Sequence, residues 1–376
     1  MNDSQPHFDS PNQAHSILII GCGFAGLRFV RACDYLRTKH PNLISRITLC
    51  DNDSRKLDRA DSGFARYDSV SEALRAEDPS AVVVAVNERM HYDVLSLLGN
   101  SRKRVVLCEK PLTDTYAHSK EIERLLRGYP LSMNLVERFS PIIQSFFRWR
   151  ESHSRLETMR VEAFWGKNRI KDLRPTMGVF SEIIHPLDLI DYLFSLRGWK
   201  VADGRCVSSN FSCSDEVLPD SVDVLLEMPG YPAIIRSSFV WEERMRLVNA
   251  IMSGGGREIY YATFAFDRPF WDCDSLTICS IDADTGAKQL ILSDKCENSD
   301  FPLELREVYK ISEFVRRSLL HLNRTEPCDQ VVELDQIIKL EAILDRINTV
   351  VRTSGQVFSH SFNKDLDTTY LPMEQK

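Results

Sequence analysis

Apolar and polar positions alternate along the first third of the chain as short apolar runs separated by amphipathic segments. The runs "ILII" (17–20), "AVVVAV" (81–86) and "VVLC" (105–108), within the predicted strands "SILII" and "RVVLC", are continuously apolar, and residues 24–37 carry apolar side chains at helical spacing. Continuously apolar strands separated by helices indicate a parallel sheet that is covered on both faces. Residues 16–135 are therefore predicted to form a doubly wound α/β domain.

The spacing changes after about residue 136. Strand-like stretches now follow one another, from "LETMRVEAFWGK" to "KQLILS", and many of the short separators contain Gly, Pro or Asp. Successive strands without intervening helices predict a mostly antiparallel sheet. Residues 136–376 are thus expected to form a second, α+β domain that binds substrate and carries a large open sheet. Two predicted helices close the chain, at 302–320 and 329–351.

Composition fits a globular protein with two domains. The chain has 376 residues, of which 43% are hydrophobic and 27% charged. The net charge of −7 argues against a nucleic-acid binder, which would show a basic face. The longest apolar runs are too short to span a membrane. Residues 1–15 are polar and lack an apolar signal core, so they are expected to be a flexible tail on a cytoplasmic protein.

The ten cysteines are scattered and form no CxxC pair, and no HExxH motif occurs. No metal site is therefore expected. The favoured interpretation of the cysteines is small buried hydrophobic residues in a reducing compartment.

A glycine motif, "GCGFAG", directly follows the first predicted strand and opens a helix. In that context it is typical of dinucleotide binding. Gly21 permits a tight turn, Gly23 lets the backbone approach a pyrophosphate, and Gly26 lets the helix pack close to the strand. Phe24 and Ala25 begin the helix whose N-terminus favours the phosphate charge.

An acidic residue follows the second predicted strand. Asp51 lies 51 − 26 = 25 residues after Gly26, near the position of a ribose-binding acid. A carboxylate there accepts a hydrogen bond from the 2′-hydroxyl group and repels a 2′-phosphate, so NAD is preferred over NADP. Arg55 and Lys56 lie just beyond it and weaken that preference. The alternative is that Asp51 is a solvated acid.

Five motifs occur in a recognisable order: "GCGFAG", "AVNERMH", "CEKPL", "NLVERFSP" and "GVFSEIIHPLD". Together they resemble the Gfo/Idh/MocA oxidoreductases, which include glucose–fructose oxidoreductase and inositol dehydrogenase. The resemblance covers about residues 16–355. The EKP tripeptide after the strand "RVVLC" is its most specific element.

The resemblance implies a role for Lys110. In the enzymes that this chain resembles, the EKP lysine reaches between nicotinamide and substrate, and the bond to the proline, here Pro111, is typically cis. Its charge polarises a carbonyl group or assists loss of a hydroxyl proton during hydride transfer. Glu109 accompanies it, and Asn87 and His91 match cofactor-side and substrate-side positions. His91 is equally compatible with a helix start that faces solvent.

The same resemblance identifies His185 with the family's catalytic histidine, which accepts or returns a hydroxyl proton. A lone histidine in an apolar helix is otherwise often structural. Sugar and cyclitol dehydrogenases of the family carry Asp where this chain has Ser181, four residues earlier on the same helix face. Glu182 is the candidate replacement, and Asp188 is expected to orient or cap locally.

Two residues of "NLVERFSP" complete the predicted site. Asn134 and Arg138 match the family's N-x-x-x-R pattern, and with Ser181 they are candidates for substrate contacts. The alternative for Arg138 is an ion pair that links the domains.

The predicted function is an NAD(P)-dependent oxidoreductase that acts on a CH–OH or C=O group of a sugar, nucleotide sugar or cyclitol. The alternatives are a reductase of an imine or keto intermediate in a specialised pathway and a non-catalytic dinucleotide-binding sensor. An open sheet exposes one face, which predicts a homodimer or homotetramer.

Overall fold

The computed structural model describes residues 14–60, 63–153, 155–170, 172, 176–196, 198–212, 216–296, 301–323 and 325–359. These residues form two compact units. The first takes those within 1–140, 270–272 and 297–342, and the second takes those within 141–269, 273–296 and 343–376. Most of the predicted tail, 1–13, lies outside the described residues.

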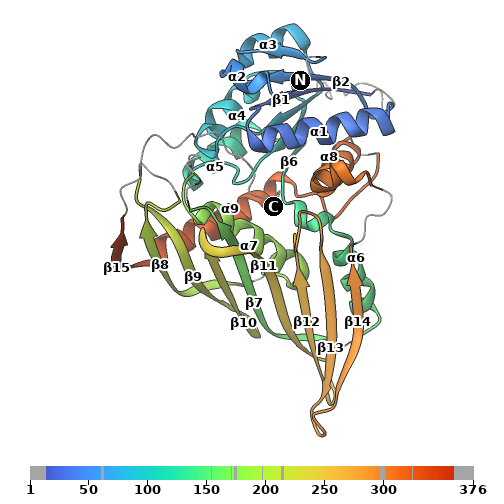
Figure 1. Ribbon diagram of the computed structural model, residues 1–376, viewed down its shortest axis with the longest axis vertical. Coiled ribbons are helices and arrows are strands. Elements are labelled where there is room, and N and C mark those ends of the chain that lie inside the picture. Colours follow the sequence, from blue (N-terminus) through green and yellow to red (C-terminus); the bar gives the residue numbers. More distant parts are fainter. Residues whose placement is uncertain are drawn as a thin grey trace, which may run out of the picture. The chain divides into compact units, whose positions relative to one another are not determined.

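A six-stranded parallel sheet is the centre of the first unit, in the order β3-β2-β1-β4-β5-β6 (Figure 1). The strands are β1 (His15–Ile20), β2 (Ile44–Cys50), β3 (Ala65–Tyr67), β4 (Ala81–Val84), β5 (Val105–Cys108) and β6 (Leu131–Met133). The helices up to Ser140 are α1 (Phe24–Lys39), α2 (Ser54–Leu57), α3 (Val70–Glu77), α4 (His91–Gly99) and α5 (Tyr116–Leu125), with the 3₁₀ turns η1 (Glu88–Met90) and η2 (Val136–Phe139).

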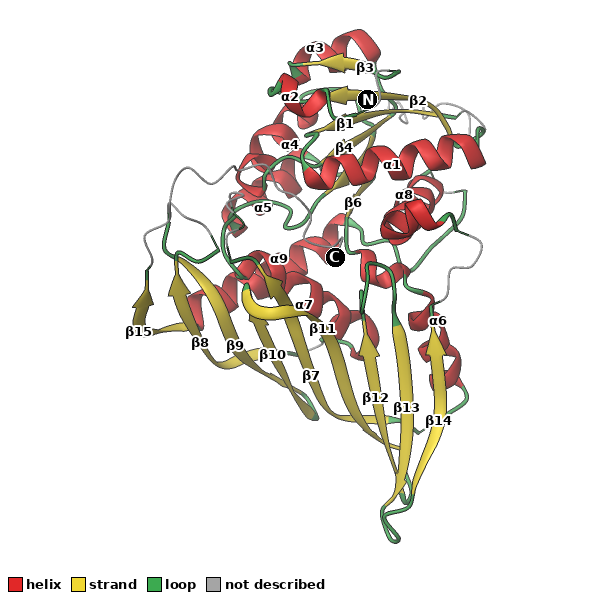
Figure 2. Cartoon of the chain, viewed as in Figure 1, coloured by secondary structure: helices red, strands yellow, loops and turns green. Residues whose placement is uncertain are grey.

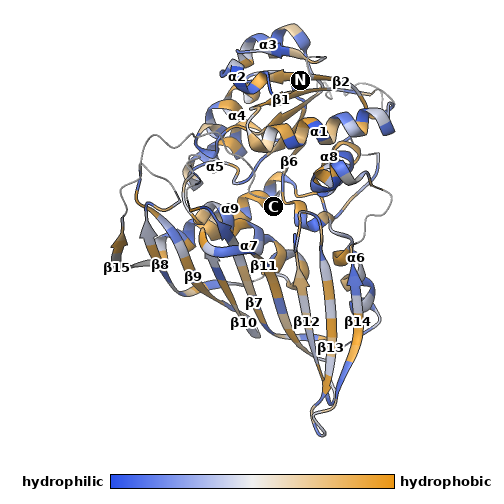
Figure 3. Cartoon of the chain, in the orientation of Figure 1, coloured by the Kyte–Doolittle hydropathy of each residue, from blue (hydrophilic) through white to orange (hydrophobic). Residues whose placement is uncertain are grey.

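The apolar runs form the inner strands of this sheet because both of its faces are covered. Every residue of β4 and β5 is buried, and the apolar residues of the neighbouring β1 are coloured hydrophobic in Figure 3. In α1 the buried residues include Phe29, Val30 and Cys33, at the spacing that the sequence predicted. The strand order reverses between β1 and β4, which is where doubly wound folds bind their ligands.

Part of the C-terminal region packs into the first unit. After η3 (Leu303–Val308), helix α8 (Tyr309–Leu322) lies on α1, and the rings of Phe29 and Phe314 meet edge to face at 6.3 Å. Phe314 also contacts Phe139 at 5.7 Å. Residues 297–342 thereby belong to the first unit, although they lie after the predicted boundary at residue 135.

The second unit contains a nine-stranded sheet in the order β14-β13-β12-β11-β7-β10-β9-β8-β15 (Figure 2). Its pairs are antiparallel except β10–β7 and β15–β8. The strands are β7 (Glu157–Asn168), β8 (Lys200–Ser209), β9 (Leu218–Met228), β10 (Tyr231–Ser238), β11 (Val240–Ser253), β12 (Glu258–Ala265), β13 (Ser275–Asp282), β14 (Lys288–Lys295) and β15 (Arg352–Phe358). Its helices are α6 (Pro141–Glu151) and α7 (Phe180–Phe194), and α9 (Leu334–Val350) has residues in both units.

The predicted fold class, a Rossmann domain followed by a large and mostly antiparallel sheet, is confirmed. Four of the α-helices and strands in the described part of the chain were not predicted, namely α2, β3, α6 and β15. Strand β3 is too short to show a period, but Pro141 at the first position of α6 is a helix-start signal that the sequence did contain. The run 233–243, predicted as one strand, is divided at the buried Phe239 into β10 and β11.

Within the described residues, no helix combines the length and the apolar character needed to cross a membrane.

Candidate dinucleotide site and catalytic residues

The glycine turn after β1 is shaped by two glycines that the fold itself requires. Gly21 has φ +92°, and a Cβ there would lie 2.6 Å from the backbone of Ala85 and Val86 at the end of β4. A Cβ on Gly26 would lie 1.7 Å from the carbonyl oxygen of Gly21. Both positions therefore permit α1 and β4 to approach the turn closely, as the motif predicted.

Gly23 differs from these two glycines because the fold leaves space beside it. It precedes α1 with φ −73°, and a Cβ built there meets no described atom within 4 Å. Phe24, which is 39% exposed, and the partly buried Ala25 begin the helix, and no side-chain cap is found for it in the described part of the chain. An uncapped helix start beside open space is suited to bind an anionic group.

Asp51 lies against this glycine turn. Its Oδ2 accepts a hydrogen bond from the backbone N–H of Cys22 at 2.8 Å, and its Oδ1 accepts one from Asp53 at 2.9 Å. The Lys56 ammonium group is 3.5 Å from Oδ1, whereas Arg55 is paired with Asp53. Asp51 is only 7% exposed, so it is not a freely solvated acid.

The thiols near the turn are held in their neutral form. Burial, together with the nearby carboxylate of Asp51, raises the pKa of Cys22 and of Cys50 to about 12. Burial likewise raises the pKa of Cys108 at the end of β5 well above its usual value. These cysteines act as small apolar residues, because the thiolate is the reactive form.

Lys110 lies in the loop that follows β5, and its peptide bond to Pro111 is cis. The neighbouring Glu109 accepts a hydrogen bond at 2.7 Å from the side chain of Asn134, just after β6. The structure therefore brings Glu109, Lys110 and Asn134 together beyond the carboxyl ends of two adjacent strands. Lys110 is partly exposed, as an ammonium group that meets a ligand must be.

His91 is fully buried, so the alternative in which it faces solvent is wrong. Its Nδ1 lies 2.8 Å from the carbonyl oxygen of Pro111, and its Nε2 lies 3.2 Å from that of Val86. The ring thus joins the loop after β4 to the loop that carries Lys110. Asn87, in the same β4 loop, accepts a hydrogen bond from Arg89 and caps η1.

Arg138 lies in η2 and is 2% exposed. Its backbone carbonyl accepts a hydrogen bond from Gln330 at 2.6 Å. Arg138 is therefore a buried residue of the first unit, and its predicted contact with substrate stays a prediction.

Helix α7 carries the predicted residues of the second unit. Ser181, Glu182, His185 and Asp188 are all at least 93% buried, with exposures of 7%, 2%, 6% and 1%. Ser181 donates a hydrogen bond to the carbonyl oxygen of Gly178 at 2.9 Å. The imidazole of His185 stacks on Trp165 of β7, with the ring centroids 5.7 Å apart.

Glu182 takes part in a network of buried charges. Its Oε2 lies 3.1 Å from the Lys167 ammonium group, and its Oε1 lies 3.4 Å from Arg246. Arg246 also pairs with Asp267 and lies 5.2 Å from the ring of Trp165. Glu182 is thus a counter-ion to two cations, and a role in proton transfer stays a prediction for it.

Comparison with known proteins identifies the first unit. Residues 15–132 match the family model for Gfo/Idh/MocA proteins, described as an oxidoreductase family with an NAD-binding Rossmann fold. This Rossmann domain belongs to the Gfo/Idh/MocA oxidoreductases. The family predicted from the sequence motifs is therefore confirmed for this domain.

A curated protein similar to part of this chain is the uncharacterized oxidoreductase C26H5.09c of Schizosaccharomyces pombe. It is 34% identical over 71 residues. The match covers 19% of this chain and only 19% of that relative.

Solved structures resemble nearly the whole of this chain in fold. KijD10, a 3-ketoreductase from Actinomadura kijaniata bound to TDP-benzene and NADP, matches with a TM-score of 0.69 at 13% identity, over 92% of this chain and 100% of its own. The UDP-N-acetylglucosamine 3-dehydrogenase GnnA from Acidithiobacillus ferrooxidans matches with a TM-score of 0.65 at 17% identity, over 90% and 98%. An Agrobacterium radiobacter oxidoreductase in complex with NAD+, L-tartaric acid and magnesium matches with a TM-score of 0.65 at 13% identity, over 90% of this chain and 97% of its own. At these identities the likeness shows the fold alone.

The sequence reasoning missed Trp165, Arg246 and Asp267 around Glu182. A signal for Arg246 did exist. It lies in β11 at one of the alternating positions that otherwise bury Val248 and Ala250, and a charge at such a position indicates a buried ion pair. Arg246 lies opposite Trp165 because of the register between β11 and β7, which the sequence does not show.

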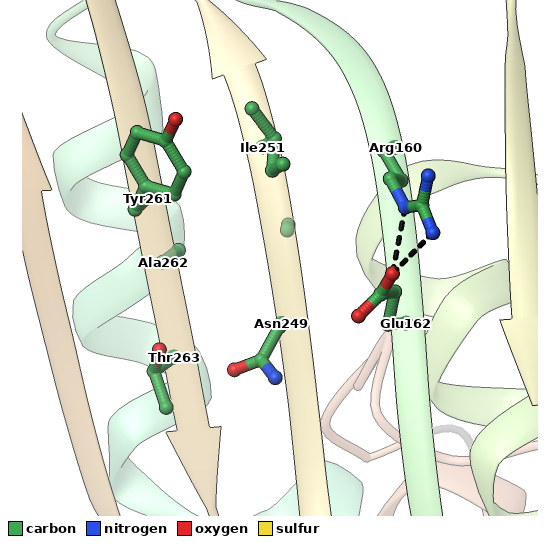
Figure 4. A pocket seen from close by; sticks show the side chains of 8 residues that line it. Arg160, Glu162, Asn249, Ile251, Tyr261, Ala262 and Thr263 are labelled. Carbon is green, nitrogen blue, oxygen red and sulfur yellow. Dashed lines mark hydrogen bonds and ion pairs between the residues drawn. The ribbon is translucent and has the colours of Figure 1, made fainter. Parts of the chain in front are cut away.

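A hollow of about 340 Å³, whose lining includes none of the predicted site residues, lies on the open face of the second sheet (Figure 4). Strands β7, β11 and β12 supply its lining, and Arg160 pairs there with Glu162 at 2.7 Å. Tyr261, which is 39% exposed, and Ile251 add apolar surface.

Proposed function

We propose that this protein is an NAD(P)-dependent oxidoreductase that transfers hydride between nicotinamide and a CH–OH or C=O group of a small polyhydroxylated or keto compound. The observation that carries the proposal is the turn at Gly23, where open space and an uncapped helix start lie beside Asp51. A pyrophosphate on the helix start and an adenosine ribose on the carboxylate match this arrangement.

NAD is the preferred cofactor in this proposal. The carboxylate of Asp51 accepts a hydrogen bond from a ribose 2′-hydroxyl group and repels a 2′-phosphate. Arg55 does not offset this repulsion, because its guanidinium group is paired with both oxygens of Asp53, whereas the Lys56 ammonium group, 3.5 Å from Oδ1 of Asp51, weakens it.

Lys110 is proposed to polarise the reacting oxygen, and His185 is proposed to exchange the hydroxyl proton. The bound nicotinamide supplies or accepts the hydride. Asn134 supports Lys110 indirectly, because it fixes the carboxylate of the adjacent Glu109.

The proposed substrate is a sugar, nucleotide sugar or cyclitol. Support comes from KijD10 and GnnA, two similar folds whose names describe a 3-ketoreductase and a UDP-N-acetylglucosamine 3-dehydrogenase. A second candidate is reduction of an imine or keto intermediate. It is favoured by Ser181 in place of the usual acid and by the engagement of Glu182 with Lys167 and Arg246.

Replacement of Gly23 by Ala tests the cofactor site. Because a Cβ fits there without contact, Gly23→Ala is expected to leave the melting temperature unchanged. Affinity for NADH, measured by nicotinamide fluorescence, is expected to fall by about tenfold or more, since the methyl group occupies the approach of the pyrophosphate.

The matched control is Gly256→Ala, another glycine beside which a Cβ meets nothing within 4 Å. It is expected to change neither stability nor NADH binding. Unaltered NADH affinity in Gly23→Ala would overturn the assignment of the pyrophosphate site. A protein that binds NADH tightly but turns over neither polyols with NAD nor keto and imine compounds with NADH would be a sensor.

We further propose that the open face of the second sheet joins two copies of the chain in a homodimer or homotetramer. The exposed ring of Tyr261, near Ile251, is the apolar part of that face (Figure 4). Light scattering is expected to give at least a dimer, and Tyr261→Arg is expected to shift it toward monomer, because a charge is costly to bury at an interface. A monomeric unaltered protein would contradict the proposal.

A further inference from the structure

The peptide group between Pro111 and Leu112 is held at both of its polar ends. Nδ1 of His91 lies 2.8 Å from the carbonyl oxygen of Pro111, the shorter of its two carbonyl contacts, and donates a hydrogen bond to it in the tautomer that carries the proton on Nδ1. The N–H group of Leu112 donates to Oε1 of Glu341, also at 2.8 Å. This peptide group directly follows the residue pair Lys110–Pro111.

The two side chains that hold it come from distant parts of the first unit. His91 begins α4, and Glu341 lies on α9, 229 residues after Leu112. Their exposures are 0% and 3%, and Leu112 is itself fully buried. Water therefore does not replace either hydrogen bond without an opening of the structure.

A peptide plane with both groups bonded in a dry environment has little freedom to rotate. Rotation would break two buried hydrogen bonds together and leave their donors and acceptors unsatisfied. The same His91 ring lies 3.2 Å from the carbonyl oxygen of Val86, so it also contacts the β4 loop. The peptide group that follows the pair Lys110–Pro111 is thus held by two side chains that lie far from it in sequence.

We propose that His91 and Glu341 are positioning residues that clamp the Pro111–Leu112 peptide and so fix the Lys110 ammonium group. The catalytic meaning of the clamp rests on the proposed function, whereas the clamp itself does not. The Glu341 carboxyl group acts here as an oxygen acceptor of a backbone N–H. A glutamine at this position keeps that oxygen and a similar volume, and a leucine keeps the volume without the oxygen.

The reactivity of the Lys110 amine tests the clamp without a substrate. Protein is treated with a limiting amount of an N-hydroxysuccinimide acetate ester, and acetylation of Lys110 is measured by peptide mass spectrometry relative to the exposed Lys103 in the same sample. Glu341→Gln is expected to leave the ratio of Lys110 to Lys103 unchanged. Glu341→Leu is expected to raise this ratio about fivefold, which corresponds to the free energy of one hydrogen bond, because the loop then opens more often.

An unchanged ratio in a folded Glu341→Leu variant would overturn the proposal. Should that variant fail to fold, hydrogen exchange at the Leu112 amide of the unaltered protein decides instead. Slow exchange supports the clamp, and exchange as fast as at an exposed loop amide contradicts it. The acetylation and exchange experiments use protein without cofactor. A failure of the protein to bind NADH would therefore count against the proposed function and not against the clamp.

Discussion

Replacement of Lys110 by Met is expected to lower kcat by a factor of about 10²–10⁴, the usual contribution of a positioned acid–base group. Met keeps much of the length of the side chain but carries neither a charge nor a proton. Lys110 is partly exposed, so the melting temperature is expected to change by no more than a few degrees. The measurement is steady-state turnover on a substrate found by screening polyols with NAD and keto or imine compounds with NADH.

Lys103→Met is the matched control, because Lys103 is an exposed lysine of the same unit that precedes β5. It is expected to keep full turnover. NADH affinity is expected to change little in either variant, since Lys110 is assigned to the reacting oxygen and not to the pyrophosphate. Turnover by Lys110→Met within about twofold of the unaltered enzyme would exclude Lys110 as a catalytic group.

Replacement of Glu341 by Gln is expected to stabilise the protein increasingly as the pH rises. Burial raises the pKa of Glu341 from its ordinary 4.5 to about 8 in the folded chain. Between these two pH values the unfolded chain ionises this carboxyl group while the folded chain keeps it neutral. The folded state then binds more protons, so this group lowers stability as the pH rises.

Gln cannot ionise, and its amide oxygen still accepts the Leu112 hydrogen bond. The free energy of unfolding of Glu341→Gln, relative to the unaltered protein, is therefore expected to rise from about pH 4.5 to pH 8 by on the order of 4 kcal/mol and then to level off. Urea unfolding across this pH range measures it. Asp345→Asn, at an exposed position of the same helix, is expected to show no such trend. A difference that is flat in pH would mean that Glu341 titrates normally.

The local pattern of apolar and polar residues was sufficient to predict the elements that depend on neighbouring residues in the sequence. The strands β1, β4 and β5 were predicted because burial on both faces requires continuous apolar runs. The turn at Gly21 and Gly26 was predicted because its steric demands recur wherever a strand, tight turn and helix meet in this way. Asp51 was found at a fixed spacing from that turn, and the structure places it there.

Long-range contacts decided what the site residues touch. His91 had two open interpretations in sequence, and neither included the buried contact with Pro111 that it makes. Glu182 was considered only as a replacement for an acid at Ser181, since its partner Arg246 lies 64 residues away in β11. The partners of such residues are set by strand register and helix packing, which no local spacing encodes.

By itself, the sequence determined the two architectures, the dinucleotide turn and the lysine at the end of β5, because these depend on hydrophobic period and on backbone sterics within a few residues. Only the tertiary structure decided that α8 packs against α1, that Glu182 serves two cations, and that Glu341 bonds to the loop of Lys110. The physical reason is that burial and hydrogen bonding are satisfied between side chains that the fold brings together from distant segments, and many sequences with the same local pattern would pair them differently.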